Sequence, residues 1–199
     1  MTETKGYRER RYLCGDGLSL YYRDYGNPAG AKTPVLCLAG LTRNSKDFHG
    51  LAHRLSKDRR VLCPDYRGRG RSDYDPDWTR YHPRTYVDDV RHLLVAAGVH
   101  EVIVIGTSMG GIIAAALAVV IPGALRAVVL NDVGPDIDSE GLDRIVAYLR
   151  DTKPLPDWDA AAAHLKATLP HMPARNPAQW RMLAEGTYRQ CEDGLLRAD

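Results

Sequence analysis

The sequence lacks any long hydrophobic run. Its longest apolar stretch, from Ile112 to Ile121, is about half as long as a membrane-spanning helix must be. The first ten residues, MTETKGYRER, are charged and contain no apolar stretch, so they do not predict a secretory signal. These two absences argue against a membrane-embedded protein, and we expect no membrane partner.

Cysteine is scarce. Only four cysteines occur in 199 residues, and none has the spacing of a CxxC motif or of a Cys/His metal site. Cys37 and Cys63 lie within apolar segments, where a thiol is most simply a small core residue. We find no pattern of histidines and carboxylates that would form a metal cage, so we expect no metal and no cofactor. The cysteine usage favours a reducing, cytoplasmic setting.

The sequence also lacks an excess of charge of one sign. Lys and Arg number 27 against 25 Asp and Glu, a net charge of +2 that is too slight to indicate a nucleic-acid partner. Arg67, Arg69 and Arg71 cluster, but they alternate with glycines and predict a turn whose charges are structural. The length and the 44% hydrophobic content fit one ordinary globular domain. We leave the oligomeric state open.

The sequence does contain an alternation of short β-like and longer helical segments, which is typical of α/β layering. Residues 8–14 and 18–25 flank a Gly-Asp-Gly turn and predict an antiparallel hairpin. Four mainly apolar segments predict strands at 34–40, 60–63, 101–106 and 127–132. The segment at 34–40 is continuously apolar, as expected for a strand that is buried on both faces. Three helical patterns lie between the four segments, at 45–55, 83–97 and 109–121. This succession predicts a mostly parallel sheet with right-handed crossovers.

The pattern changes after Val133. We expect helices over 138–150, 157–169 and 176–190, and no strand, so that the final third is helical only. On this basis we divide the chain into an α/β core, residues 1–135, and a helical lid, residues 136–199.

The most diagnostic unit is the run Gly-Thr-Ser-Met-Gly at residues 106–110. An apolar strand pattern precedes it and an apolar helix pattern follows it. In a strand–GxSxG–helix unit the chain turns so sharply that side chains two residues either side of the serine would collide, which glycine at 106 and 110 avoids. Such a turn exposes the serine hydroxyl. We therefore predict that Ser108 is a nucleophile.

We predict that two backbone N–H groups form an oxyanion hole beside Ser108. The N–H of Met109 would point at the charge that develops on a carbonyl oxygen, and the helix that begins there favours negative charge. A second donor is expected from the loop after the strand at 34–40, where Gly40 would let the backbone approach and Leu41 would offer its N–H. The predicted catalytic residues are therefore Ser108, Met109 and Leu41.

Three motifs follow one another in a characteristic order. They are AGLTRN at 39–44, DYRGRGRS at 65–72 and GTSMGG at 106–111. Together they resemble the oxyanion loop, the Asp-x-Arg-Gly-x-Gly-x-Ser stretch and the nucleophile elbow of the α/β-hydrolase fold family, in its esterase, lactonase and haloperoxidase-like group. Ala39 departs from the family's usual histidine, although the backbone donor is kept. Serine at the elbow counts against the dehalogenase and epoxide-hydrolase branches, which attack with a carboxylate.

The resemblance covers roughly residues 10–135. It implies a three-layer, mostly parallel sheet with an N-terminal antiparallel hairpin. It further implies hydrolysis of a carboxylic ester, lactone or related acyl bond in a small-molecule substrate. It also implies a triad in the order Ser, acid, His, with the acid after a seventh strand and the histidine after an eighth. We see neither strand, so we expect a sheet lacking its last two strands, a partial lid, and an acid and histidine beyond Asp199. The isolated chain would then be inactive and would associate through an exposed sheet edge.

One alternative completes the triad within the chain. Asp132 directly follows the strand at 127–132, and His164 or His171 would keep the order, although neither histidine follows a strand. The other histidines precede the serine and are expected to be surface or packing residues: His49, His53, His82, His92 and His100.

Two other functions stay open. One is a catalytically silent small-molecule-binding homologue, and the other is a C–C bond hydrolase or perhydrolase with the same machinery.

Overall fold

The computed structural model describes residues 6–134, 153–169, 172 and 174–198. The chain forms two compact units, Met1–Val133 and Gly134–Asp199. The helix expected at 138–150 lies outside the described residues. No helix among the described residues is both long enough and apolar enough to cross a membrane.

One six-stranded sheet organises the described part of the first unit. Its strands are β1 (Arg8–Leu13), β2 (Ser19–Tyr25), β3 (Val35–Leu38), β4 (Val61–Pro64), β5 (Val102–Thr107) and β6 (Leu125–Asn131). In space they follow the order β1-β2-β4-β3-β5-β6. The pairs β1–β2 and β2–β4 are antiparallel, and β4–β3, β3–β5 and β5–β6 are parallel. The expected hairpin and mostly parallel sheet are confirmed.

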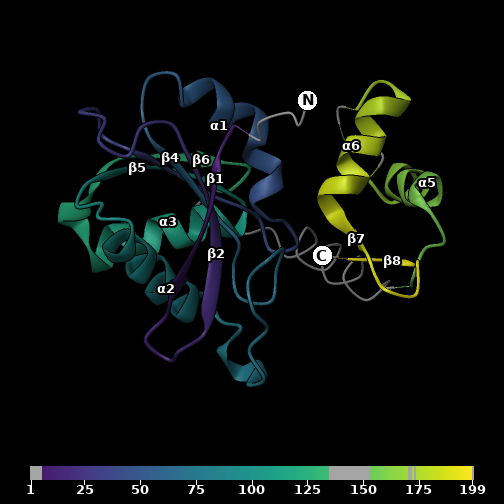
Figure 1. Ribbon diagram of the computed structural model, residues 1–199, viewed down its shortest axis with the longest axis horizontal. Coiled ribbons are helices and arrows are strands. Elements are labelled where there is room, and N and C mark those ends of the chain that lie inside the picture. The colour runs from purple at the N-terminus through teal and green to yellow at the C-terminus, as the bar shows by residue number, and fades with distance from the viewer. Residues whose placement is uncertain (1–5, 135–152, 170–171, 173, 199) are drawn as a thin grey trace. The chain divides into compact units, whose positions relative to one another are not determined.

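Helices cover both faces of this sheet. They are η1 (Ser45–Phe48), α1 (His49–Leu55), η2 (Trp78–Arg80), α2 (Pro83–Ala96), α3 (Met109–Val120) and η3 (Pro122–Ala124). Tyr25 and Asp24 are neighbours on β2, so their side chains point to opposite faces. The Tyr25 hydroxyl lies 3.1 Å from Nδ1 of His49 on α1, whereas Asp24 binds Arg60, which donates to the Ala97 carbonyl at the end of α2. Thus α1 and α2 lie on opposite faces, and α3 packs beside α2 (Figure 1).

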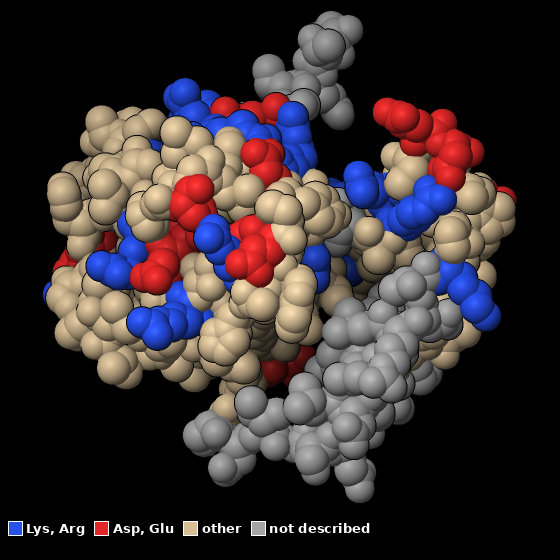
Figure 2. Space-filling model, turned by 90° about the horizontal axis from the view of Figure 1, so that it is seen from below, with Lys and Arg blue, Asp and Glu red and all other residues tan. Residues whose placement is uncertain are grey.

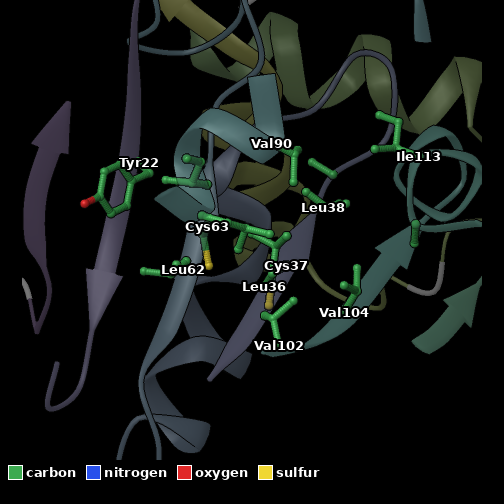
Figure 3. Close-up of a cluster of buried hydrophobic side chains, with 14 of the residues drawn as sticks. Tyr22, Leu36, Cys37, Leu38, Leu62, Cys63, Val90, Val102, Val104 and Ile113 are labelled. Atoms are coloured by element: carbon green, nitrogen blue, oxygen red, sulfur yellow. The ribbon is translucent and has the colours of Figure 1, made fainter. Parts of the chain in front are cut away.

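The apolar core is centred on β3, β4 and β5. Every residue of β3 and β4 is buried, as expected for strands covered on both faces. Cys37 and Cys63 lie among the side chains of these strands, with Val90 of α2 and Ile113 of α3 packed nearby (Figure 3). Both thiols are free and fully buried, which confirms their role as small core residues. Burial raises the pKa of the Cys63 thiol well above its usual range.

A buried ionic network centres on Arg67, whose side chain is 1% exposed. Its Nε and Nη2 donate to the two carboxylate oxygens of Asp89 at 2.9 and 2.6 Å. Its Nη1 donates to Asp75 at 2.5 Å and to Asp16 at 2.9 Å. One guanidinium therefore joins the loop after β4 to α2 and to the β1–β2 turn, which confirms a structural role for this arginine.

The second unit has a small core of its own. It is built from α5 (Trp158–Thr168), α6 (Pro177–Thr187) and a hairpin of β7 (Tyr188–Gln190) and β8 (Leu196–Ala198). Six residues form its buried cluster: Ala161, Leu165, Trp180, Ala184, Tyr188 and Leu196. The expectation of helices only was wrong, because α6 ends at Thr187 and the chain then turns through Gly194, which has a φ of 80°. Strands of three residues are too short to produce a recognisable alternation.

The surface and the sheet edge carry different residue types. Basic and acidic side chains lie interspersed over the larger unit in the view of Figure 2, in keeping with the small net charge. The edge strand β6 is apolar instead, and Val128, Val129 and Leu130 are 37%, 50% and 50% exposed. An exposed apolar edge is a site at which another chain can pair. The association of the 199-residue chain with another chain through this edge accordingly stays a prediction.

Candidate active site

Ser108 stands at the tip of a sharp turn between β5 and α3. Its φ of 51° and ψ of −118° lie in a region that side chains rarely adopt, which is typical of a nucleophile held in strained geometry. Its N–H donates to the Asn131 carbonyl at 2.9 Å, and its carbonyl accepts the N–H of Gly111 at 2.8 Å. The turn is therefore fixed by the end of β6 on one side and by the first turn of α3 on the other.

Two glycines make this turn possible. A Cβ at Gly106 would overlap the Gly110 carbonyl, and a Cβ at Gly110 would overlap the carbonyl oxygen of Leu38. Both obstacles are backbone atoms, which cannot move aside as a flexible side chain can. The steric reason for the GxSxG spacing is thus confirmed at 106 and 110.

Gly40 has a different role from the one expected. A Cβ there would lie 3.7 Å from the Ser108 Cβ and 3.9 Å from the Thr107 carbonyl oxygen, which are ordinary contacts. Close approach of the backbone therefore does not require glycine at this position. What the glycine does is leave open the space beside the Ser108 side chain.

The two predicted oxyanion donors belong to segments next to Ser108, namely the start of α3 and the loop that contains Gly40. Met109 is the first residue of α3, so its N–H has no acceptor within the helix. Leu41 follows Gly40 in a turn that the Arg43 N–H closes on the Gly40 carbonyl at 3.1 Å. Within the part of the chain that the structure describes, neither N–H makes a hydrogen bond. Their role as oxyanion donors stays a prediction.

The loop at 65–72 binds the predicted oxyanion loop, residues 39–44, and the adjoining Ser45 through three side chains. The Tyr66 hydroxyl donates to the Ala39 carbonyl at 3.2 Å, and Nε of Arg69 donates to the Leu41 carbonyl at 3.0 Å. Asp65 accepts the N–H of Ser45 at 2.7 Å. Burial raises the pKa of Asp65, and hydrogen bonds from backbone N–H groups oppose that rise. Sequence reasoning missed these contacts, because bonds between distant loops leave no spacing signal.

The histidines before the serine lie elsewhere, as expected. All five are exposed: His49, His53, His82, His92 and His100. His82 caps α2 by accepting the N–H of Arg84 at 3.2 Å. His164 lies in α5, and His171 lies outside the described residues. Within the described ranges no histidine hydrogen-bonds to Ser108, and no group of three His, Cys, Asp or Glu side chains could hold a metal ion.

Asp132 lies at the same edge of the sheet as Ser108. It follows β6, whose last residue pairs with Thr107 of β5, and its φ is 55°. Among the described residues, only Ser108 shares with Asp132 a positive φ at a residue other than glycine. Strained backbone of this kind clusters at functional sites.

Comparison with known proteins places this geometry in a wider group. A sequence profile of the α/β hydrolase fold matches residues 33–179. The chain is 36% identical to a 3-hydroxybutyrate-oligomer hydrolase from Cupriavidus necator, over 87% of this chain and 60% of the relative. It is 32% identical to a 2-(acetamidomethylene)succinate hydrolase from Mesorhizobium japonicum, over 83% of this chain and 58% of the relative. The chain thus spans about three fifths of these two relatives.

Comparison with solved structures also finds hydrolases of this fold. An α/β hydrolase from Novosphingobium aromaticivorans is 40% identical, with a TM-score of 0.93 over 98% of this chain and 68% of that one. The crystal structure of E-2-(acetamidomethylene)succinate hydrolase matches with 30% identity and a TM-score of 0.83, over 96% of this chain and 68% of that one. The chain belongs to the α/β hydrolase fold family.

Proposed function

We propose that the protein is a serine hydrolase that cleaves a carboxylic ester, lactone or related acyl bond. The observation that carries this proposal is the strained backbone of Ser108 at the start of α3, beside the loop that contains Gly40. The N–H groups of Met109 and Leu41 have no acceptor among the described residues. The names of both curated relatives describe hydrolases, and one acts on oligomers of 3-hydroxybutyrate, whose units are joined by ester bonds. This likeness supports an ester of a small hydroxy acid as the substrate class.

In the proposed reaction, Ser108 Oγ attacks the carbonyl carbon while a general base takes its proton. The carbonyl oxygen becomes negative and accepts hydrogen bonds from the N–H groups of Leu41 and Met109. The leaving alcohol departs with the proton, and water then hydrolyses the acyl-serine. We assign to Asp132 the task of orienting the histidine that acts as base, because it lies at the same edge as Ser108.

The test is turnover of a p-nitrophenyl ester by the wild-type protein and by Ser108→Ala, with and without added imidazole. Imidazole serves as an external base, since no described histidine hydrogen-bonds to Ser108. Without imidazole we expect a rate near background. With imidazole we expect the wild type to exceed the rate of the same imidazole solution without protein, and Ser108→Ala to equal that rate. Ser56→Ala, a change at the end of α1, should leave the rate unchanged.

A folded wild-type protein without turnover under either condition would contradict hydrolysis. It would favour a small-molecule-binding homologue that keeps the elbow without using it. Turnover that persists in Ser108→Ala would instead assign the reaction to another residue.

A further inference from the structure

The oxyanion loop is fixed by hydrogen bonds to two consecutive peptide groups. The Arg43 N–H bonds the Gly40 carbonyl, which belongs to the same peptide plane as the Leu41 N–H. Arg69 bonds the Leu41 carbonyl, which belongs to the next plane. With both planes held, the backbone dihedrals of Leu41 have little freedom. The direction of its N–H is then set before any substrate binds.

Arg69 is itself held in place. Its Nη1 donates to the Gly68 carbonyl at 2.8 Å, so one guanidinium bridges its own loop and the oxyanion loop. The side chain is only partly exposed. A planar guanidinium with two fixed acceptors keeps one orientation. Arg69 thus differs from Arg67, whose bonds all go to carboxylates away from this loop.

We propose that Arg69 is a positioning residue for the Leu41 oxyanion donor. The side chain fixes the peptide that follows Leu41, and its positive charge lies beside the loop where negative charge develops in the transition state. The inference rests on the proposed function, because it needs an oxyanion at this site. It goes further by assigning a supporting role in catalysis to Arg69, the second of the three arginines in the loop at 65–72, which the sequence alone predicts to be a turn.

The test is the rate at which a fluorophosphonate labels Ser108 in the presence of imidazole as external base, followed by intact mass at several reagent concentrations. Arg69→Met removes both hydrogen bonds, and Arg69→Lys can restore one. We expect the maximal labelling rate constant to fall about 10-fold in Arg69→Met, with half-saturation within about twofold, because a small displacement of a donor costs rate rather than affinity. Arg69→Lys should recover part of the loss. Arg91→Met, a change in an exposed arginine of α2, should label like the wild type.

Two further readouts separate positioning from mere folding. Amide exchange of residues 39–45 should quicken in Arg69→Met, whereas exchange of residues 158–168 should not change. A smaller labelled fraction with an unchanged rate constant would overturn the inference, because it would mean that Arg69 only keeps the protein folded. Equal rate constants in wild type and Arg69→Met would also overturn it. If the wild type fails to label at Ser108 at all, the proposed function fails, and the inference fails with it.

Discussion

The interiors of the two units are built differently. The first unit buries a sheet on both faces and, within it, a charged network around Arg67. In the described part of the second unit, a buried cluster of six residues, none of them charged, lies between two helices and a short hairpin. The first interior depends on residues that no other type could replace at the same position. Examples are the elbow glycines, which pack directly against backbone carbonyls, and Arg67, whose guanidinium binds several buried carboxylates. The second depends on apolar contact, which tolerates substitution. We therefore expect single changes to cost more in the first unit.

The largest effect should come from the elbow glycine. Gly110→Ala places a Cβ against the carbonyl oxygens of Leu38 and Ala39, which cannot give way. We expect the free energy of unfolding of the first unit to fall by about 4 kcal/mol or more, or the unit not to fold. Gly123→Ala is the matched control, because a Cβ there meets no atom within 4 Å. A Gly110→Ala protein as stable as Gly123→Ala would contradict the strained-turn geometry.

Arg67→Met should have the next largest effect. It leaves the carboxylates of Asp75 and Asp89, each 4% exposed, without their buried partner. Breaking a buried ion pair from one side costs about 3–5 kcal/mol. Urea unfolding monitored for the first unit measures this loss. Arg91→Met, with its exposed partner Asp88, should cost less than about 1 kcal/mol, and similar losses in both variants would refute the special role of the network.

In the second unit, Leu196→Ala should cost about 2–4 kcal/mol, because the side chain is 1% exposed and belongs to the buried cluster. Hydrogen exchange of α5 and α6 reports on this unit separately. Met182→Ala removes an apolar side chain that is 68% exposed, and we expect it to change exchange little. If Leu196→Ala proved as mild as Met182→Ala, the second unit would lack the core described above.

The smallest effect should come from a helix cap. The Asn176 side chain accepts the N–H of Gln179 at 2.9 Å at the start of α6. Asn176→Ala should cost about 1 kcal/mol, and Asn176→Asp should restore stability because a carboxylate accepts the same bond. Local exchange in the first turn of α6 measures both. Equal exchange in the two variants would show that the cap contributes nothing.

The same difference explains what the sequence predicts well. The hairpin at 8–25 and the elbow at 106–110 were predicted because each demands particular residues at fixed spacing. The β7–β8 hairpin was missed because three-residue strands are too short to show a period. The expectation that close approach of the backbone requires glycine at position 40 was wrong, because the distance between two loops leaves no signal in the sequence. The contacts of Tyr66 and Arg69 with the oxyanion loop were missed too. They join segments far apart in the chain, and only the fold brings them together.

The central claim is that Ser108 is the nucleophile of a preorganised acyl-transfer site. The most direct measurement is peptide mapping after treatment of the folded protein with a fluorophosphonate in the presence of imidazole. We predict one adduct, on the peptide that contains Ser108, absent from Ser108→Ala and from denatured wild type. An adduct on another residue, or equal labelling of folded and denatured protein, would contradict the claim.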